Sequence, residues 1–586
     1  MTRAHAMRWG ATVEPGGATF RLWAPAAGAV EVESGGTRTA LKRREDGWFE
    51  RTIPGAGPGD RYRFIVDGRS VPDPASRFQP DDVEGPSELI DPQSFAWTDD
   101  AWKGRPWHEA VILELHVGTF TAEGTYAAAA AQLDRLARLG ITAIELMPLA
   151  DFAGARNWGY DGVLPFAPDS RYGRPEALKA LVCEAHRLGL MVLIDVVYNH
   201  FGPAGNYLSL YAPPFFAKRD TPWGQGLDFS SRHLRDFFID NALYWVEEFH
   251  VDGLRFDAVH AIADDSDPHF LDELAETVRA RQPPGRLVHL VLENDRNEAR
   301  FLRSGFYDAQ WNDDFHHVMH VLLTGEADGY YADYIDRPLD KLGRALTEGF
   351  VHQGEWSEFR AAARGEPSRH LPPIAFVNFL QNHDQIGNRA FGERLTRLAP
   401  APALEAATAL QLLAPGIPLL FMGEELGADA PFLFFCDFGG DLAAAVRDGR
   451  RREFARFPAF ASEEARRRIP DPLAIETFEK SRIDGAIARP DAARSDLYRR
   501  LLAVRRDEIA PHLAANGAVD ADHAVVAGVL TAQWRFSDGA RLALAANLTR
   551  DPRPWAPPSG DWRRIWGPAN ADPLPPWTVI WMAARP

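Results

Sequence analysis

Residues 191–200 read MVLIDVVYNH and residues 251–260 read VDGLRFDAVH, and each is an apolar run that ends in polar residues. Amphipathic segments of helical period, such as those at 127–140, 175–189 and 232–249, lie between runs of this kind. Alternating strands and helices predict parallel strands joined by right-handed crossovers. The remaining runs that complete a set of eight are VILELHV (111–117), TAIELMP (142–148), LVHLVLEND (287–295), FYDAQWND (306–313), IAFVNFLQNHD (374–384) and PLLFMGEE (418–425).

Two α/β folds compete for this pattern. Eight strand–helix units over about 400 residues predict a closed (β/α)8 TIM barrel with long loops. An open, doubly wound sheet would carry a glycine-rich phosphate-binding turn after its first strand, and residues 111–117 are not followed by one. We therefore expect a multidomain α/β protein with a barrel at its centre.

The segments before and after the barrel have a different sequence pattern. Strands separated by Gly and Pro turns predict an N-terminal β-sandwich within residues 1–95, with Pro72–Asp91 as the linker. The catalytic barrel is expected to span 96–513, ending in a helix at 495–513. A C-terminal antiparallel β-domain, expected to be a second sandwich, is predicted for 514–586 from the runs at 525–536, 540–548 and 577–583.

Charge and composition exclude several classes of partner. The formal net charge of −18 disfavours nucleic acid and anionic membranes, both of which need clustered Lys and Arg, and suits a neutral substrate. Cys183 and Cys436 give no disulfide framework, which favours a reducing cytoplasm. We see no signal peptide and no run long enough to span a membrane.

Carboxyl groups dominate the strand ends, where the active site of a TIM barrel lies. Arg255 and Asp257 are two residues apart on one strand, so both point to the same side, and the guanidinium would keep Asp257 ionised as a nucleophile suits. Glu293 ends an almost entirely apolar strand, where a raised pKa would suit a general acid. His383 and Asp384 end another strand.

Three carboxyls around one cavity fit glycosidic cleavage. One attacks, one protonates the leaving oxygen, and one stabilises the oxocarbenium-like state; in retaining enzymes the first two lie about 5–5.5 Å apart. A single Asp at such a position is more often an ion-pair partner or a helix cap, but three acids with two His and one Arg favour catalysis. Asp195 lies within the apolar run 191–200, which also holds Asn199. Its carboxyl could orient neighbouring side chains by hydrogen bonds or could be purely structural, and the sequence favours neither role.

Metal chemistry is the alternative at the same strand ends, because histidine is a common metal ligand. The paired histidines that open the first strand of barrel metallohydrolases are missing, since His116 stands alone. His316 and His320 have i, i+4 spacing but lack the following Glu of zinc proteases. We therefore expect no catalytic metal, no structural calcium and no cofactor, with the histidines at strand ends bonding sugar hydroxyls instead.

The segments DVVYNH, GLRFDAVH, the Glu of LVLEND and FLQNHD together resemble the four motifs of the α-amylase clan of glycoside hydrolases (family 13). This resemblance implies that Asp257 is the nucleophile, Glu293 the acid/base and Asp384 the transition-state stabiliser. It also implies that Tyr160 in NWGYD stacks on the sugar in subsite −1. Hydroxyl-binding roles are implied for His200, Arg255, His260 and His383.

Further segments in order along the chain, among them ELHVGTFTAEGTY, ADFAGARNWGYDGV and QWNDDFHHVMHVLLTGEADGYY, resemble the trehalose-releasing branch of that clan. The resemblance implies hydrolysis of the α-1,4 bond next to the terminal trehalose of maltooligosyltrehalose, and functional coupling to the synthase that makes this substrate. It also implies that the N-terminal sandwich is of a carbohydrate-binding type.

Selectivity for a trehalose end must come from loops that bind the leaving side of the substrate. We expect the loop after the sixth strand to supply Asp313, Asp314, His316 and His317, and the TPWG segment (221–224) to supply Trp223 as an apolar platform. The alternative for WNDDFHH is a helix N-cap with solvated side chains. Gln385 and Asn388 also lie where a bound sugar would pass.

Two other functions stay open on these residues. A glycogen branching or debranching enzyme of the same clan would share the sandwich and the MGEE segment (422–425). An inactive barrel kept as a glucan-binding module is disfavoured, because all three carboxyls are present.

Overall fold

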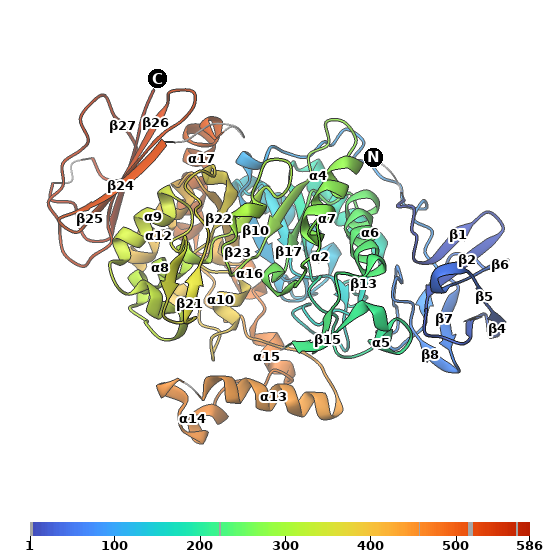
Figure 1. Cartoon of the computed structure of the whole chain (residues 1–586). Helices are drawn as coiled ribbons and strands as arrows, with labels where there is room; N and C mark the ends of the chain where they lie inside the picture. Colours follow the sequence, from blue (N-terminus) through green and yellow to red (C-terminus); the bar gives the residue numbers. More distant parts are fainter. Residues whose placement is uncertain (1–3, 222–223, 456, 514–519, 570–571, 586) are drawn as a thin grey trace.

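The computed structural model describes residues 4–221, 224–455, 457–513, 520–569 and 572–585. At its centre is a closed barrel of eight parallel strands (Figure 1), which confirms the predicted fold. The last strand pairs with the first, Ile112 with Leu419, so the barrel has no free edge. The strands are β10 (Ile112–Leu115), β11 (Ala143–Leu146), β14 (Met191–Val196), β17 (Gly253–Phe256), β18 (His289–Leu292), β19 (Ala309–Trp311), β22 (Phe376–Asn378) and β23 (Ile417–Phe421).

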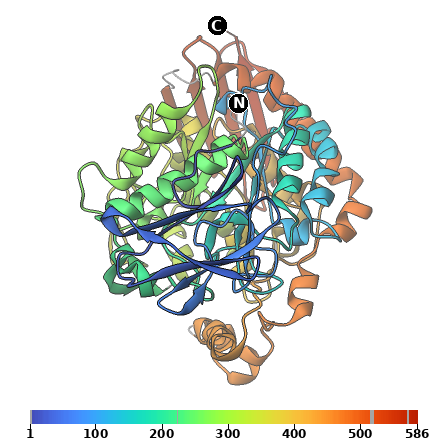
Figure 2. The same ribbon diagram turned by 90° about the vertical axis from the view of Figure 1, so that its right-hand side faces the viewer.

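The predicted helices surround the barrel. The segment 127–140 forms two helices, α2 (Tyr126–Ala130) and α3 (Leu133–Leu139), and α3 ends at Gly140 in the left-handed conformation that glycine permits. α4 spans Pro175–Arg187 and α6 spans Arg232–Glu248. Most residues of α6 are buried, and His5, Trp9 and Arg77 of the N-terminal region contact it at Asp240, Phe237 and Glu248. Figure 2 shows the N-terminal sheets in front of the barrel.

The N-terminal region is a sandwich of two antiparallel sheets, as predicted. One sheet holds β1 (Gly10–Glu14), β2 (Gly17–Trp23), β6 (Trp48–Pro54) and β5 (Lys42–Arg43). The other holds β4 (Thr37–Ala40), β3 (Val30–Ser34), β7 (Arg61–Val66), β8 (Arg69–Val71) and β9 (Ser87–Glu88). Phe20 and Tyr62, one from each sheet, meet with ring centroids 5.1 Å apart, so the space between the sheets is a packed aromatic core.

The segment after the sandwich is more than the linker expected for Pro72–Asp91. Asp73, Ser76 and Gln79 are fully buried in it, and Arg77 is 5% exposed. Arg77 donates to both carboxylate oxygens of Glu248 on α6, at 3.2 and 3.1 Å. The segment therefore clamps the sandwich to the barrel, and the domain boundary expected near residue 95 remains a prediction.

The C-terminal region is one antiparallel sheet, and the second sandwich expected there is wrong. Its strands are β24 (Asp520–Val526), β25 (Val529–Arg535), β26 (Arg541–Asn547), β28 (Thr578–Ala584) and β27 (Arg563–Trp566), in that order. The run 525–536, read as one strand, turns back at Ala527 and Gly528, both with positive φ, as a two-residue hairpin requires. The sheet needs no second layer, because α9 (Pro338–Thr347) and α12 (Ala401–Leu413) of the barrel cover it.

A helical hairpin, α13 (Gly440–Phe454) and α14 (Glu463–Arg467), projects from the barrel (Figure 1). The helix predicted at 495–513 is α17 (Ala492–Glu508). Cys183 and Cys436 are unpaired thiols. Across the described part of the chain, every helix is too short or too polar to cross a membrane.

Replacing Arg77 by Met tests the clamp. The substitution leaves Glu248 buried, with the Lys179 ammonium 3.8 Å away. Removing one partner of a buried ion pair costs about 3–5 kcal/mol, so urea unfolding should show a loss of that order. Arg138→Met is the matched control, because Arg138 pairs with Asp134 in solvent, where a pair contributes about 0–1 kcal/mol. Equal losses in the two variants would contradict a structural role for the clamp.

Candidate active site

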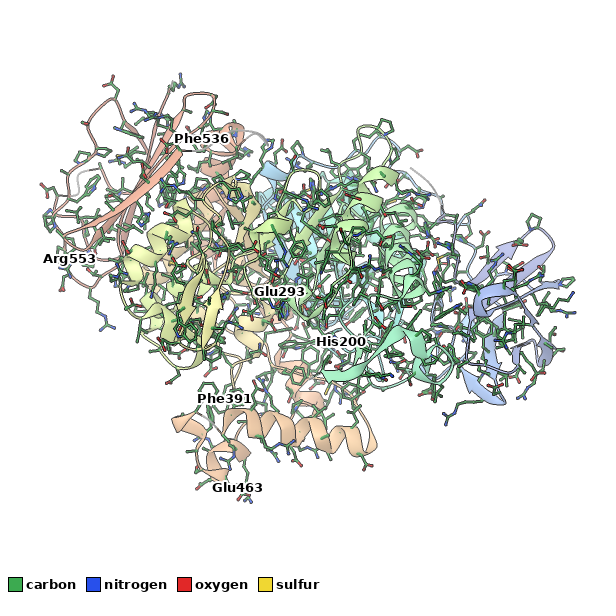
Figure 3. The ribbon with its side chains drawn as sticks, viewed as in Figure 1. His200, Glu293, Phe391, Glu463, Phe536 and Arg553 are labelled. Carbon is green, nitrogen blue, oxygen red and sulfur yellow. The ribbon has the colours of Figure 1, made fainter. Side chains whose placement is uncertain are left out.

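The three predicted catalytic carboxyls lie at the carboxyl ends of barrel strands. Asp257 directly follows β17, and Glu293 directly follows the neighbouring strand β18. Asp384 lies in the first turn of α10 (His383–Gly387), which follows β22. Figure 3 shows Glu293 near the middle of the barrel. The barrel closure thus brings together residues that are 127 positions apart in the chain.

Arg255 is the cation at the centre of this group. It is 0% exposed, and it pairs through Nη1 with Asp195 at 2.7 Å and with Asp257 at 3.0 Å, and through Nη2 with Glu293 at 2.8 Å. Its guanidinium lies 4.1 Å from the ring centroid of Trp311 on β19, an arrangement that stabilises a buried cation. One side chain therefore holds the predicted nucleophile and the predicted acid as neighbours.

Asp257 and Glu293 occupy different environments. Asp257 accepts hydrogen bonds from Arg255 and from Asn199 Nδ2 at 2.9 Å, one on each carboxylate oxygen, so its orientation is fixed. Glu293 accepts from the Ala258 amide at 2.8 Å. Burial raises the pKa of Glu293, Arg255 opposes that rise, and the charge of Asp257 adds to it. Glu293 is thus the member of the pair suited to hold a proton.

Asp384 faces the same space. Burial raises its pKa, the imidazole of His383 lowers it, and Glu293 raises it. His383 Nε2 lies 3.5 Å from Asp384 Oδ1, and Asn388 Nδ2 donates to the same oxygen at 3.3 Å. The pKa of His383 is raised to about 9 despite its burial, because Glu114 and Asp384 are its neighbours.

The predicted sugar-contacting residues Tyr160, Asp195, His200 and His260 gather around the acids. Tyr160 stacks on His383 with centroids 5.0 Å apart and donates to Asp195 Oδ2 at 2.6 Å. Burial raises the pKa of Asp195 to about 7. His200 bonds to Asn199 and to the Tyr160 carbonyl, and His260 Nδ1 accepts from an amide of the loop after β18.

The residues predicted from the loop after β19 lie in a helix and divide into two sets, and their sugar-binding role stays a prediction. Asp313 lies near Glu293 and Asp384, and accepts from Gln385 Nε2 at 3.4 Å. Asp314 is fully buried and paired with Arg364, and His316 bonds to the Leu380 carbonyl at 2.6 Å. In α8 (Asp313–Thr324) successive residues point about 100° apart, so only part of the run can face the site.

The last two of the predicted substrate-binding residues are His317 and Trp223. His317 is 8% exposed and its ring packs 4.6 Å from Tyr330, so it supports the rim through a neighbour. Tyr330 in turn donates to Gln385 Oε1 at 3.5 Å. Trp223 lies outside the described residues.

Several titratable residues that lie near the acids were not predicted from the sequence. Glu114 and Glu145 lie in register on β10 and β11, and both are about 1% exposed. Asp295 pairs with Arg360 on the loop that joins β20 (Glu355–Ser357) to β21 (Ala362–Arg364). A carboxyl residue inside each of the apolar strands ILEL (112–115) and AIEL (143–146) could have been noticed in the sequence. The sequence around Arg360 gives no comparable indication. Among the described residues, no cluster of three or more His, Cys, Asp or Glu could hold a metal ion.

Comparisons with known proteins agree with this fold. Residues 89–220 match the alpha amylase catalytic domain, 8–92 match carbohydrate-binding module 48 (isoamylase N-terminal domain), and 514–581 match a domain of unknown function.

Malto-oligosyltrehalose trehalohydrolase of Deinococcus radiodurans is 45% identical, with 86% of this chain and 84% of that protein covered. The protein of the same name from Saccharolobus solfataricus is 44% identical, with 76% and 80% covered. The crystal structure of a putative alpha amylase from Salmonella typhimurium superimposes with a TM-score of 0.93 at 43% identity, over 99% of this chain and 100% of that one. The chain belongs to the malto-oligosyltrehalose trehalohydrolase family.

Proposed function

We propose that this protein hydrolyses, with retention, the α-1,4-glucosidic bond next to the terminal trehalose of maltooligosyltrehalose and releases trehalose. The observation that carries the proposal is the pair Asp257 and Glu293, held on adjacent strands by the one guanidinium of Arg255. Membership of the trehalohydrolase family supports the choice of substrate.

The reaction follows from the two environments. Asp257 attacks the anomeric carbon while the Glu293 proton passes to the glycosidic oxygen, so trehalose leaves as a neutral alcohol. The glycosyl ester on Asp257 is then opened by water, whose proton returns to Glu293. Asp384, beside the imidazolium of His383, stabilises the positive charge that develops on the sugar ring. Tyr160 provides the stacking face for that ring.

On the leaving side, we propose that Asp313, Gln385 and Asn388 bond trehalose hydroxyls. Tyr330 and the loop that carries Phe359 and Arg360 extend this rim; the Tyr330 and Phe359 rings lie 6.1 Å apart. Phe359 is 44% exposed, which leaves an apolar face for a sugar. Because the substrate must be made by a synthase that forms a trehalose end on a maltooligosaccharide, we also propose functional coupling to such an enzyme, in the cytoplasm.

Product analysis tests the proposed substrate. Purified protein incubated with maltooligosyltrehalose should release free trehalose and a shortened maltooligosaccharide, and the same protein given amylose should form no branch points. New branch points without trehalose would assign a branching activity instead. Binding of maltodextrins with no cleavage of either substrate would identify a glucan-binding barrel.

Asp257→Asn and Glu293→Gln test the mechanism. Asp257→Asn removes the nucleophile, so turnover should be lost while maltodextrin binding persists. Glu293→Gln should lower kcat about 10²- to 10⁴-fold, the usual contribution of a general acid. Because a raised pKa keeps Glu293 protonated to higher pH, the wild-type rate should fall on the alkaline side as Glu293 ionises, and the variant should lose that limb. A wild-type alkaline limb in Glu293→Gln would refute the assignment.

Asp313 and its neighbour Asp314 form a matched pair. Asp313→Ala removes one hydrogen-bond partner at the rim, so kcat/KM for maltooligosyltrehalose should fall roughly 2- to 10-fold relative to a plain maltooligosaccharide of equal length. Asp314→Ala should instead lower stability, because it leaves Arg364 buried without its closest carboxylate. A change in selectivity with Asp314→Ala alone would reverse the two roles.

A further inference from the structure

Glu114 is a buried carboxylate that the proposed reaction does not use. It lies on β10, is about 1% exposed, and faces His383 at the start of α10. One of its oxygens bonds to His383 Nδ1, and the other accepts from the His383 backbone amide at 3.1 Å. Both oxygens are thus committed to one residue, the one that immediately precedes Asp384.

We infer that Glu114 is a positioning residue for the reaction: it fixes the turn at His383 and Asp384 and holds His383 as the imidazolium that faces Asp384. This inference rests on the proposed role of Asp384 in glycosidic cleavage. Both hydrogen bonds that Glu114 accepts come from His383, so it acts on the reaction mainly through that residue.

The side chains packed around His383 determine which group its second ring nitrogen, Nε2, faces. Tyr160 stacks on one face, and Trp158 meets the ring edge-on at 5.5 Å. With Nδ1 bonded to Glu114, the ring presents Nε2 to Asp384 at 3.5 Å. The bond to Glu114 therefore decides both the orientation of the ring and the group that its second N–H faces.

The charges around the pair determine the sign of the effect. For His383, burial lowers the pKa, and Glu114 is the largest influence that raises it. For Asp384, His383 is the largest influence that lowers the pKa, and the direct repulsion from Glu114 is a smaller one that raises it. Removing the charge of Glu114 should therefore make His383 neutral and raise the pKa of Asp384. The other titratable groups that face this pair are His116, Glu145, Tyr160, Arg255, Glu293, Asp313 and Tyr330.

Glu145 supplies a matched control one strand away. It is in register with Glu114 and equally buried, yet neither of its carboxyl oxygens has a hydrogen-bond partner among the described residues. Burial raises the pKa of Glu145 well above its usual range, which favours its protonated form. Glu145→Gln therefore leaves the hydrogen bonds of the described residues intact, whereas Glu114→Gln places an amide donor against a donor of His383.

The test compares wild type, Glu114→Gln, Glu114→Asp and Glu145→Gln on maltooligosyltrehalose across pH. Glu114→Gln should lower kcat at pH 7 about 10- to 100-fold, the value of one hydrogen bond to a charged group. The acid limb of its kcat/KM profile should move to higher pH, because Asp384 then takes up a proton sooner as pH falls. Glu114→Asp, which keeps the carboxylate, should show a smaller shift of the acid limb than Glu114→Gln. Glu145→Gln should match wild type.

A readout independent of turnover separates the inference from the proposed function. In protein labelled with ¹⁵N-histidine, NMR should show His383 doubly protonated at pH 7 in wild type and Glu145→Gln, and singly protonated in Glu114→Gln; a His383→Gln spectrum assigns the signals. An unchanged His383 signal and acid limb in Glu114→Gln would overturn the inference. An equal loss of activity and thermal stability in Glu114→Gln and Glu145→Gln, with no change in pH profile, would show a purely structural role. Absence of trehalose release by wild type would instead overturn the proposed function.

Discussion

The buried guanidinium of Arg255 is the interaction on which the catalytic end of the barrel depends. Three carboxyls from three strands converge within hydrogen-bonding reach of it, and it is fully excluded from solvent. Burying a charge costs several kcal/mol unless partners with good geometry offset it. The carboxylates and the face of Trp311 meet that condition, so the guanidinium and the acids define one another's positions.

The other acids of the site either lie beside a second cation or have pKa values that burial raises. His383 carries a second cation, held between Glu114 and Asp384. Burial raises the pKa values of Glu293, Asp313 and Glu145, which favours their protonated forms. Burial thus disfavours negative charge on these three carboxyls, and Glu293 is one of those whose protonated form is favoured.

The opposite end of the barrel is built for stability. Asp252, which is fully buried, accepts from Trp102 at 2.7 Å and pairs with Arg286 at 2.6 Å and His186 at 3.0 Å. Trp9 of the sandwich packs edge-on against Phe237 of α6 at 5.1 Å, and Arg77 clamps the same helix. As in other TIM barrels, contacts at this end stabilise the fold, and the loops at the carboxyl ends of the strands form the substrate site.

The sequence by itself determined the eight strands, their order and the residues that end them, because alternation of apolar strands with amphipathic helices is written locally. It also predicted that Asp257, Glu293, Arg255 and Asp384 lie together, since parallel strands bring their ends to one side. Only the tertiary structure decided which of the neighbours Asp313 and Asp314 faces the site, because helix rotation and the buried Arg364 select between them. Likewise, Glu114 and Glu145 occur in similar sequence contexts. Only the closed barrel gives Glu114 a hydrogen bond to His383 and leaves the carboxyl oxygens of Glu145 without a hydrogen-bond partner among the described residues.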